Sequence, residues 1–241
     1  ELQTELQPML RDAIMETAEA VGRFDAEQVA EGLRTWAAGI GAVVRDSGDL
    51  NRLMEETIAI QKLAALNNVE FASTVDTVGG IMHEYGLTTR DVNHITEVLN
   101  YTAAKSFANV DDLGDAFKMV GPIAAEMGIS FEETAAAFAL LSDANITATM
   151  AGRAFRQMNI HVLDSNEKYN RVMNESLGLT GKLGDTWQSV VYPEGRFIGL
   201  PEFIDLLAAS TENLTDQERG YRLAAMATAN ELPTLATLVQ N

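Results

Sequence analysis

Val120-Gly-Pro-Ile-Ala-Ala-Glu-Met-Gly-Ile-Ser130 repeats, 42 residues further on, the stretch Val78-Gly-Gly-Ile-Met-His-Glu-Tyr-Gly-Leu-Thr88. Each copy reads as the end of a helix, a glycine turn, a capping residue and the start of a second helix. Gly86 and Gly128 stand where a left-handed residue would end the first helix. The pattern predicts antiparallel helical hairpins. Two copies do not establish a solenoid, so chance similarity between hairpins stays open as the alternative.

The sequence also contains signals for the starts of helices. Ser130-x-x-Glu133 and Thr215-x-x-Glu218 fit the capping box, in which each side chain satisfies a free amide of the first turn. Pro122 should interrupt or kink its helix, because proline donates no amide and crowds the preceding turn. Further predicted start positions are N-caps at Asp111 and Thr88, and a first turn at Pro201.

Composition extends the helical interpretation to the whole chain. Hydrophobic residues make up 46% of the 241 residues and aromatic residues only 7%, with frequent Ala, Leu, Met and Glu. Unbranched side chains of this kind lose little rotamer freedom in a helix, which predicts an all-α fold. Helices are expected at 2–20, 26–45, 50–66, 69–85, 89–106, 112–127, 131–144, 148–163, 167–177, 201–211, 216–228 and 231–241.

One glycine-rich stretch, 178–200, interrupts the helical pattern. It could form a small hairpin that pairs residues 190–192 with 196–198, or an ordered loop. The predicted organisation is N-terminal helices at 1–69, core helical hairpins at 70–177, this loop or hairpin at 178–200, and C-terminal helices at 201–241. The chain begins without Met and stops inside a helical pattern, so we interpret it as a fragment of a longer protein.

Apolar residues at helical spacing indicate a core, and Gly152 either permits a close helix approach beside Phe155 or stands there by chance. The predicted core residues are Phe107, Leu113, Phe117, Val120, Ile123, Met127, Phe131, Phe138, Leu141 and Phe155.

The chain is strongly acidic, with 35 acidic and 17 basic residues and a net charge of −18. Between Ser106 and Gly152 the only basic residue is Lys118. Such a surface repels phosphate, so we expect no direct binding to nucleic acid and no contact with an anionic membrane. There is no cysteine, which excludes disulfides and thiolate chemistry.

The sequence contains no recognisable catalytic, cofactor-binding or metal-binding group. His83, His94 and His161 lack zinc-binding spacing. Ser165-x-x-Lys168 matches one nucleophile motif, but its partner motifs are missing, so it is better explained as a helix start. Acidic pairs are better explained as helix caps than as a glycosidase pair, because Trp36 and Trp187 lie in unrelated segments. The predicted acidic pairs are Glu132/Glu133 and Asp111/Asp112.

Several runs resemble the core region of phage tail tape measure proteins, over about residues 70–235. They are Thr102-Ala-Ala-Lys-Ser-Phe-Ala-Asn-Val-Asp-Asp-Leu-Gly-Asp-Ala-Phe-Lys-Met-Val120, continuing through Ser130 and the helix after it; Ala151-Gly-Arg-Ala-Phe-Arg156; Glu194-Gly-Arg-Phe-Ile-Gly-Leu-Pro-Glu-Phe-Ile-Asp-Leu-Leu207; and Leu214-Thr-Asp-Gln-Glu-Arg219. The chain departs from the family at Met226-Ala-Thr228, where members often have Phe-Gly. It also lacks a long heptad shaft and an apolar membrane segment, as a fragment would.

The resemblance implies a non-enzymatic structural protein around which the tail tube polymerises, with a length that sets the length of the tail. It implies a position in the lumen of the virion tail, after assembly in the host cytoplasm, and exit ahead of the DNA. Implied partners are other copies of the chain in a small homo-oligomer, the tail tube protein, and tail tip or baseplate proteins. The frequent helix ends predict a compact module instead of one long shaft. An acidic helical-repeat adaptor that recruits a basic partner is the alternative, followed by a helical lytic enzyme.

Overall fold

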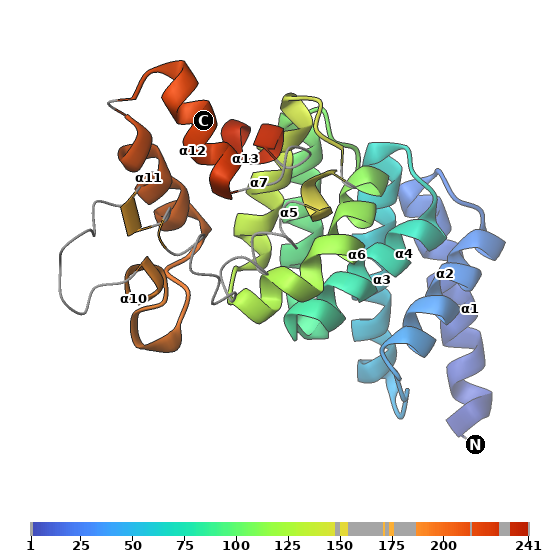
Figure 1. Ribbon diagram of the computed structural model, residues 1–241. Coiled ribbons are helices and arrows are strands. Elements are labelled where there is room, and N and C mark those ends of the chain that lie inside the picture. Colours follow the sequence, from blue (N-terminus) through green and yellow to red (C-terminus); the bar gives the residue numbers. More distant parts are fainter. Residues whose placement is uncertain are drawn as a thin grey trace. The chain divides into compact units, whose positions relative to one another are not determined.

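The computed structural model describes residues 2–147, 150–153, 171, 174–175, 187–212, 214–226 and 232–240. These residues form helices and connecting turns, and none of them lies in a β-strand, which confirms the all-α prediction. The chain divides into two compact units (Figure 1). The first unit holds residues 1–105 and 109–118, and the second holds 106–108 and 119–241. The division into four segments made from the sequence stays a prediction.

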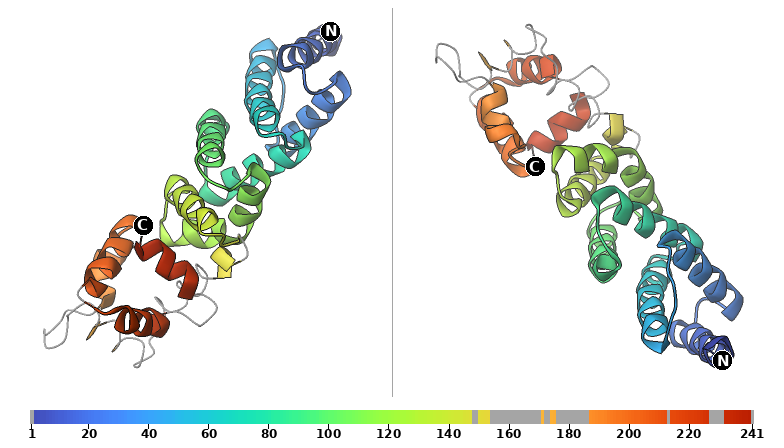
Figure 2. Two further views of the ribbon diagram at one scale, coloured as in Figure 1. Left: turned by 90° about the horizontal axis from the view of Figure 1, so that it is seen from above. Right: turned by 90° about the horizontal axis from the view of Figure 1, so that it is seen from below.

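The first unit is a series of helices that fold back on one another. Figures 1 and 2 show α1 to α5 side by side, and α3 contacts α1, α2, α4 and α5. The longest described helix is α3, with 21 residues. The elements of this unit are α1 (Leu2–Val21), α2 (Ala26–Gly39), α3 (Ser47–Asn67), α4 (Phe71–Tyr85), the 3₁₀ turn η1 (Thr89–Asp91), α5 (Val92–Lys105) and the first part of α6 (Val110–Met127).

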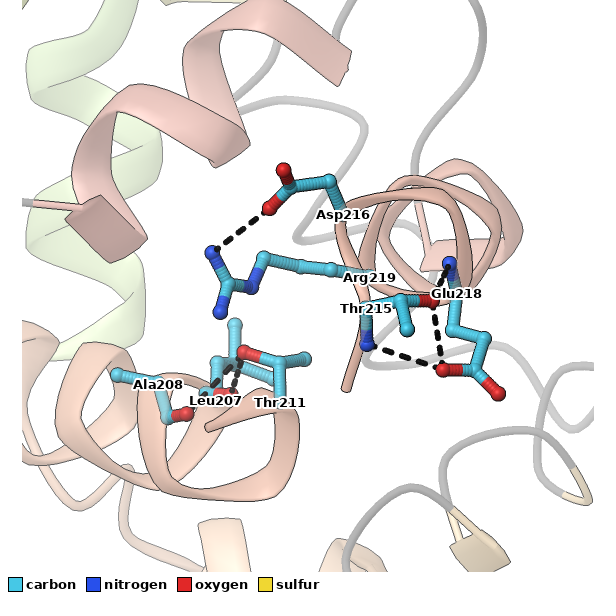
Figure 3. A network of polar contacts seen from close by, with 7 residues as sticks. All are labelled: Leu207, Ala208, Thr211, Thr215, Asp216, Glu218 and Arg219. Carbon is cyan, nitrogen blue, oxygen red and sulfur yellow. Dashed lines mark hydrogen bonds and ion pairs between the residues drawn. The ribbon is translucent and has the colours of Figure 1, made fainter. Parts of the chain in front are cut away.

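The second unit continues α6 and packs α13 against α7, α11 and α12. Figure 3 shows the start of α12, where the Thr215 amide donates to Glu218 at 3.0 Å and the Glu218 amide donates to Thr215 Oγ1 at 3.3 Å. The predicted capping box is therefore confirmed. The remaining elements are α7 (Phe131–Asp143), α10 (Trp187–Val191), the 3₁₀ turn η2 (Pro193–Gly195), α11 (Leu200–Thr211), α12 (Asp216–Met226) and α13 (Leu232–Gln240).

Helices in both units end in the same kind of turn. A left-handed residue is followed by an apolar residue, whose amide donates to the carbonyl five residues earlier, as in a Schellman motif. These N–H···O distances lie between 2.8 and 3.1 Å. The predicted left-handed helix ends at Gly86 and Gly128 are confirmed. The left-handed residues of the described turns with this bond are Gly41, Asn68, Gly86, Gly128 and Asn145.

Glycine permits close helix crossings in three places. Gly152 lies against α6, which agrees with the expectation that it permits a close helix approach. Phe155, which was expected beside it, lies outside the described residues. A Cβ would lie 2.0 Å from the Phe71 ring at Gly32, 2.4 Å from Thr77 Oγ1 at Gly114, and 3.0 Å from Met119 Cβ at Gly152. A larger residue at Gly32 or Gly114 would therefore require the side chain of Phe71 or Thr77, or the helix that carries it, to shift.

Several sequence-based expectations need correction at helix boundaries. The predicted helix 26–45 ends at Gly39, because Gly41 adopts a left-handed conformation and closes the turn. Asp111 is not an N-cap, since α6 begins one residue earlier and the Asp112 amide donates to Asn109 Oδ1 at 2.8 Å. α6 runs through Pro122, so the expected interruption does not occur, and the Pro122 side chain is exposed.

The stretch 178–200 contains no hairpin in its described part. α10 and η2 occupy residues 187–195, and one backbone bond joins the Ile198 amide to the Val191 carbonyl at 3.0 Å. Tyr192, Phe197 and Phe203 form an aromatic cluster with ring centroids 5.4 and 5.7 Å apart. The loop alternative is therefore closer to the structure than the hairpin.

Most of the predicted core is buried. Phe117, Val120 and Leu141 are at most 1% exposed, and Leu113, Met127, Phe131 and Phe138 are also buried. Ile123 is half-buried. Phe107 is the clear error: its side chain is 82% exposed, because it lies in the connection before α6 and not on a packed helix face. Among the described residues, no helix is both long enough and apolar enough to cross a membrane.

Candidate interaction surface

The two histidines in the described part of the chain lie on different helices. His83 lies on α4 and His94 on α5, and both side chains are exposed. Within the described part of the chain, no group of three or more His, Cys, Asp or Glu is placed to hold a metal ion. His161, Ser165 and Lys168 lie outside the described residues.

The acidic pairs lie in the first turns of helices, as the sequence predicted. Glu133 accepts the Ser130 amide at 2.8 Å, and the Glu133 amide donates to Ser130 Oγ at 3.1 Å, which completes a capping box. Asp111 accepts a hydrogen bond from the Ser73 hydroxyl at 2.9 Å and so links α6 to α4. These carboxylates therefore act in helix capping and helix contacts.

Trp36 is a buried core residue. Its ring is 1% exposed, and its indole N–H donates to Glu56 Oε2 at 2.9 Å. A buried Trp commonly needs such a partner for its single donor. This ring is not available as a platform for a sugar or another ligand, and the Trp187 side chain lies outside the described part.

The first unit has a groove between α3 and α5. Its volume is about 450 Å³, and Ile58, Ala59 and Leu63 contribute apolar surface to it. Leu66 at one end is 74% exposed. Charged residues flank the apolar surface, namely Glu55 and Lys62 on α3 and Glu97 on α5. Asn93, Thr96 and Asn100 of α5 complete the lining.

The groove residues of α3 share one face because they recur at three- and four-residue intervals. This face was not predicted from the sequence, although the spacing of Glu55, Ile58, Lys62 and Leu66 could have indicated it. The two long helices that form the groove run in the same direction, with Asn67 Nδ2 donating to Asn100 Oδ1 at 3.0 Å at their C-terminal ends. The α4 helix returns the chain between them.

A second groove, also of about 450 Å³, lies where the 40–44 connection meets the starts of α3 and α5. Val43 on its edge is 66% exposed. Arg52 and Arg90 line it together with acidic residues, and Asp49 pairs with Arg52. The Arg45 amide and the Arg52 side chain donate hydrogen bonds to Asp49 and lower the pKa of that carboxyl.

Phe107 is an exposed aromatic residue on the second unit whose backbone is held in place. Its amide donates to Asp143 Oδ1 at the end of α7, at 2.9 Å. The next residue, Ala108, is buried, and its amide donates to Ser106 Oγ at 3.2 Å. The ring therefore projects from an ordered connection. No signal in the sequence indicates this exposure, because an isolated Phe between helices is equally consistent with a core position.

Two buried polar groups of the first unit have no hydrogen-bond partner among the described residues. Gln61 on α3 is fully buried, and neither its amide nitrogen nor its amide oxygen is paired. Glu84 on α4 has one buried, unpaired carboxylate oxygen. Burial raises the pKa of Glu84 to about 7, although the nearby Lys118 ammonium acts to lower it.

Comparison with known proteins identifies relatives from phage tails. The chain is 26% identical to the tape measure protein of Pneumococcus phage Dp-1 over 229 residues, which cover 92% of the chain and 19% of that relative. It is 32% identical to the probable tape measure protein of Escherichia phage P2 over 121 residues, which cover 50% of the chain and 15% of that relative. The chain thus matches less than a fifth of the length of these relatives. No solved structure matches it.

The family described as phage-related minor tail protein matches residues 11–229. The matched range includes the turns at Gly86 and Gly128 and the helices on both sides of each. It also includes all of the runs that carried the resemblance in the sequence. This chain belongs to the family of phage-related minor tail proteins.

Proposed function

We propose that this chain is a segment of a tape measure protein, around which the tail tube polymerises and whose length sets the tail's length. The observation that carries the proposal is the similarity to a tape measure protein over 92% of the chain. The proposed role is structural and not enzymatic. It places the segment in the tail lumen of the virion, after assembly in the host cytoplasm.

The fold supports a role for this segment as a folded module, because its helices are short and reverse direction. An α-helix rises about 1.5 Å per residue, so 241 residues in one straight helix would span roughly 360 Å. The longest described helix has 21 residues, and the chain reverses direction after the turns at Asn68 and Gly86. We therefore propose that this segment is a folded module of the tape measure protein, distinct from a straight shaft that acts as the ruler.

Charge supports the proposed departure ahead of the DNA. The net charge of −18 gives the chain a surface that does not hold passing phosphate groups. Proposed partners are further copies of the chain, the tail tube protein, and tail tip or baseplate proteins. The exposed groove and the exposed Phe107 ring offer surface for such contacts.

The first experiment is peptide mass spectrometry on purified virions of the source phage. Peptides from 1–241 within a longer parent chain are expected in tails. An in-frame deletion of this segment then tests the tail length by electron microscopy. We expect defective tails, or tails shortened by much less than the roughly 360 Å that a straight helix of this length would contribute.

A control deletion removes the same number of residues from a continuous helical stretch of the parent chain, and should shorten tails by close to the full straight-helix length. Absence of the peptides from virions would contradict the proposal. Tails of normal length and infectivity after the deletion would also contradict it.

An acidic adaptor remains the second candidate. Residues 119–152 contain no Lys, Arg or His, whereas Glu126, Glu132, Glu133 and Asp143 give the stretch four negative charges. Such a surface would favour a basic partner through complementary charge. Salt-sensitive binding of a basic host protein, combined with absence from virions, would favour this candidate over the tail role.

A further inference from the structure

The exposed face of α3 carries charges in an order that is complementary to itself. Ile58 and Ala59 lie at its centre, Glu55 lies three residues before Ile58, and Lys62 lies three residues after Ala59. At about 1.5 Å of rise per residue, each charge lies roughly 5 Å along the helix from the midpoint. An antiparallel copy of the same face therefore places a lysine opposite each glutamate.

Both charges are available for a partner. Glu55 and Lys62 are exposed, and neither has an ion-pair partner within the described residues. Leu66, on the same face, is 74% exposed, although a leucine gains from burial. The groove beside this face, with its volume of about 450 Å³, can receive side chains from a second helix.

We propose that the α3–α5 groove is a self-association surface, in which the α3 helix of a second copy lies antiparallel across a two-fold axis. Ile58 and Ala59 lie at the axis, and Ala59 permits close approach of the two helices. Glu55 faces Lys62 of the partner subunit, and the symmetry repeats this pair. The inference deepens the proposed function, which names further copies of the chain as partners, by assigning that contact to one face of α3; it rests on the proposed function for its role in tails.

The charge order favours a second copy over other occupants. A uniformly basic partner would satisfy Glu55 and Glu97 but would place like charge opposite Lys62. A uniformly acidic partner would do the reverse. The net charge of −18 repels a second copy at long range, but salt screens charges beyond about 8 Å at physiological ionic strength. Contacts between adjacent groups then decide the association.

The expected affinity is modest. Exposed ion pairs each contribute little, and one helix face with the rim of a second helix is a small interface. We therefore expect a dissociation constant in roughly the micromolar range or weaker. Sedimentation velocity of the 241-residue chain over a wide concentration series measures it.

Two single charge reversals and their mixture form the test. Lys62→Glu alone and Glu55→Lys alone should each weaken association by about tenfold or more, because each creates two like-charge pairs across the axis. An equimolar mixture of the two variants should associate as well as the wild type, because both cross pairs become attractive. The double variant carrying both reversals should also recover.

Controls separate this geometry from net charge and from misfolding. The two single variants change the net charge in opposite directions, so an effect of net charge would strengthen association in Glu55→Lys. Glu27→Lys and Lys105→Glu reverse exposed charges elsewhere in the first unit and should leave association unchanged. Far-UV circular dichroism of every variant should match that of the wild type.

The proposal is overturned if the wild type stays monomeric over the whole concentration series. It is also overturned if the mixture and the double variant do not recover, or if Glu55→Lys associates more strongly than the wild type. Each of these results concerns the purified chain. Each is therefore distinguishable from a failure of the tail role, which the virion experiments test.

Discussion

The two copies of the helix–turn–helix repeat have the same turn and different surroundings. Gly86 and Gly128 adopt φ values of 63° and 77°, and the amides of Leu87 and Ile129 both donate at 2.9 Å to the carbonyl five residues earlier. Yet Ile129 is 1% exposed, whereas Leu87 is only half-buried. Local sequence therefore sets the turn, and packing by other helices sets how much each position contributes to stability.

The acidic residue of the repeat shows the same difference more sharply. Glu84 and Glu126 occupy equivalent positions, 42 residues apart. Glu84 has a buried, unpaired carboxylate oxygen, whereas the Glu126 side chain is exposed. The difference arises because the first copy packs beside α6, where Tyr85 meets the Phe117 ring edge-on with centroids 6.1 Å apart.

The largest expected loss of stability comes from disturbing the packing of Phe117 in α6 against the first copy of the repeat. Phe117→Ala should destabilise the chain by about 3–5 kcal/mol, because it removes a buried aromatic ring and leaves a cavity. Phe107→Ala should change the free energy of unfolding by no more than about 0.5 kcal/mol, because that ring is already in solvent. Urea denaturation measures both. A loss above about 2 kcal/mol for Phe107→Ala would contradict the exposed position of the ring.

The next largest expected losses of stability come from truncating the apolar residues that follow the two glycines. Ile129→Ala should cost about 2–5 kcal/mol, as expected for a fully buried aliphatic side chain. Leu87→Ala should cost less, about 1 kcal/mol, because that side chain is only half-buried. The same urea titration compares them. Equal losses would show that the two copies have equivalent surroundings, contrary to the structure.

The glycines themselves should respond alike. Gly86→Ala and Gly128→Ala should each cost about 1–2 kcal/mol, because both φ values are positive. Nothing lies within 4 Å of the added Cβ at either position, so no steric clash adds to this cost. Thermal denaturation of the two single variants measures this. Gly80→Ala, at an open helical position in α4, is the matched control and should be neutral or slightly stabilising. A cost at only one of the two turns would break the equivalence of the repeat.

The smallest expected effect concerns pH. The pKa of Glu84 is raised from 4.5 to about 7, so the unfolded chain ionises first as pH rises. The Glu84 contribution to stability is therefore greatest below pH 4.5, falls between 4.5 and about 7, and is fully lost above about 7. Because the carboxyl is only half-buried, we expect this loss to be about 1 kcal/mol.

Glu84→Gln should remove that loss and make the chain more stable than the wild type by about 1 kcal/mol near pH 8, with the advantage gone near pH 4. Urea denaturation at a series of pH values measures the difference. Glu126→Gln is the matched variant at the equivalent exposed position and should differ from the wild type by less than about 0.5 kcal/mol throughout. An equal pH effect in both variants would contradict the buried position of Glu84.

Local signals in the sequence determined the helical class, most helix boundaries, the caps at Ser130 and Thr215, and the turns at Gly86 and Gly128. These features depend on backbone amides and residues within one turn, so they are readable from neighbouring positions. Asp111 shows the limit, because Asn109 two residues earlier offers the same kind of cap and the chain uses that one.

Only the tertiary structure decided which apolar and charged residues meet. Nothing near Phe107 in the sequence distinguishes its exposed ring from the buried ring of Phe117. The α3–α5 groove likewise brings together residues more than 30 positions apart, such as Lys62 and Glu97. Burial and charge environment depend on helices that are distant along the chain, so the same repeat gives Glu84 and Glu126 different chemistry, and the sequence of either copy cannot reveal it.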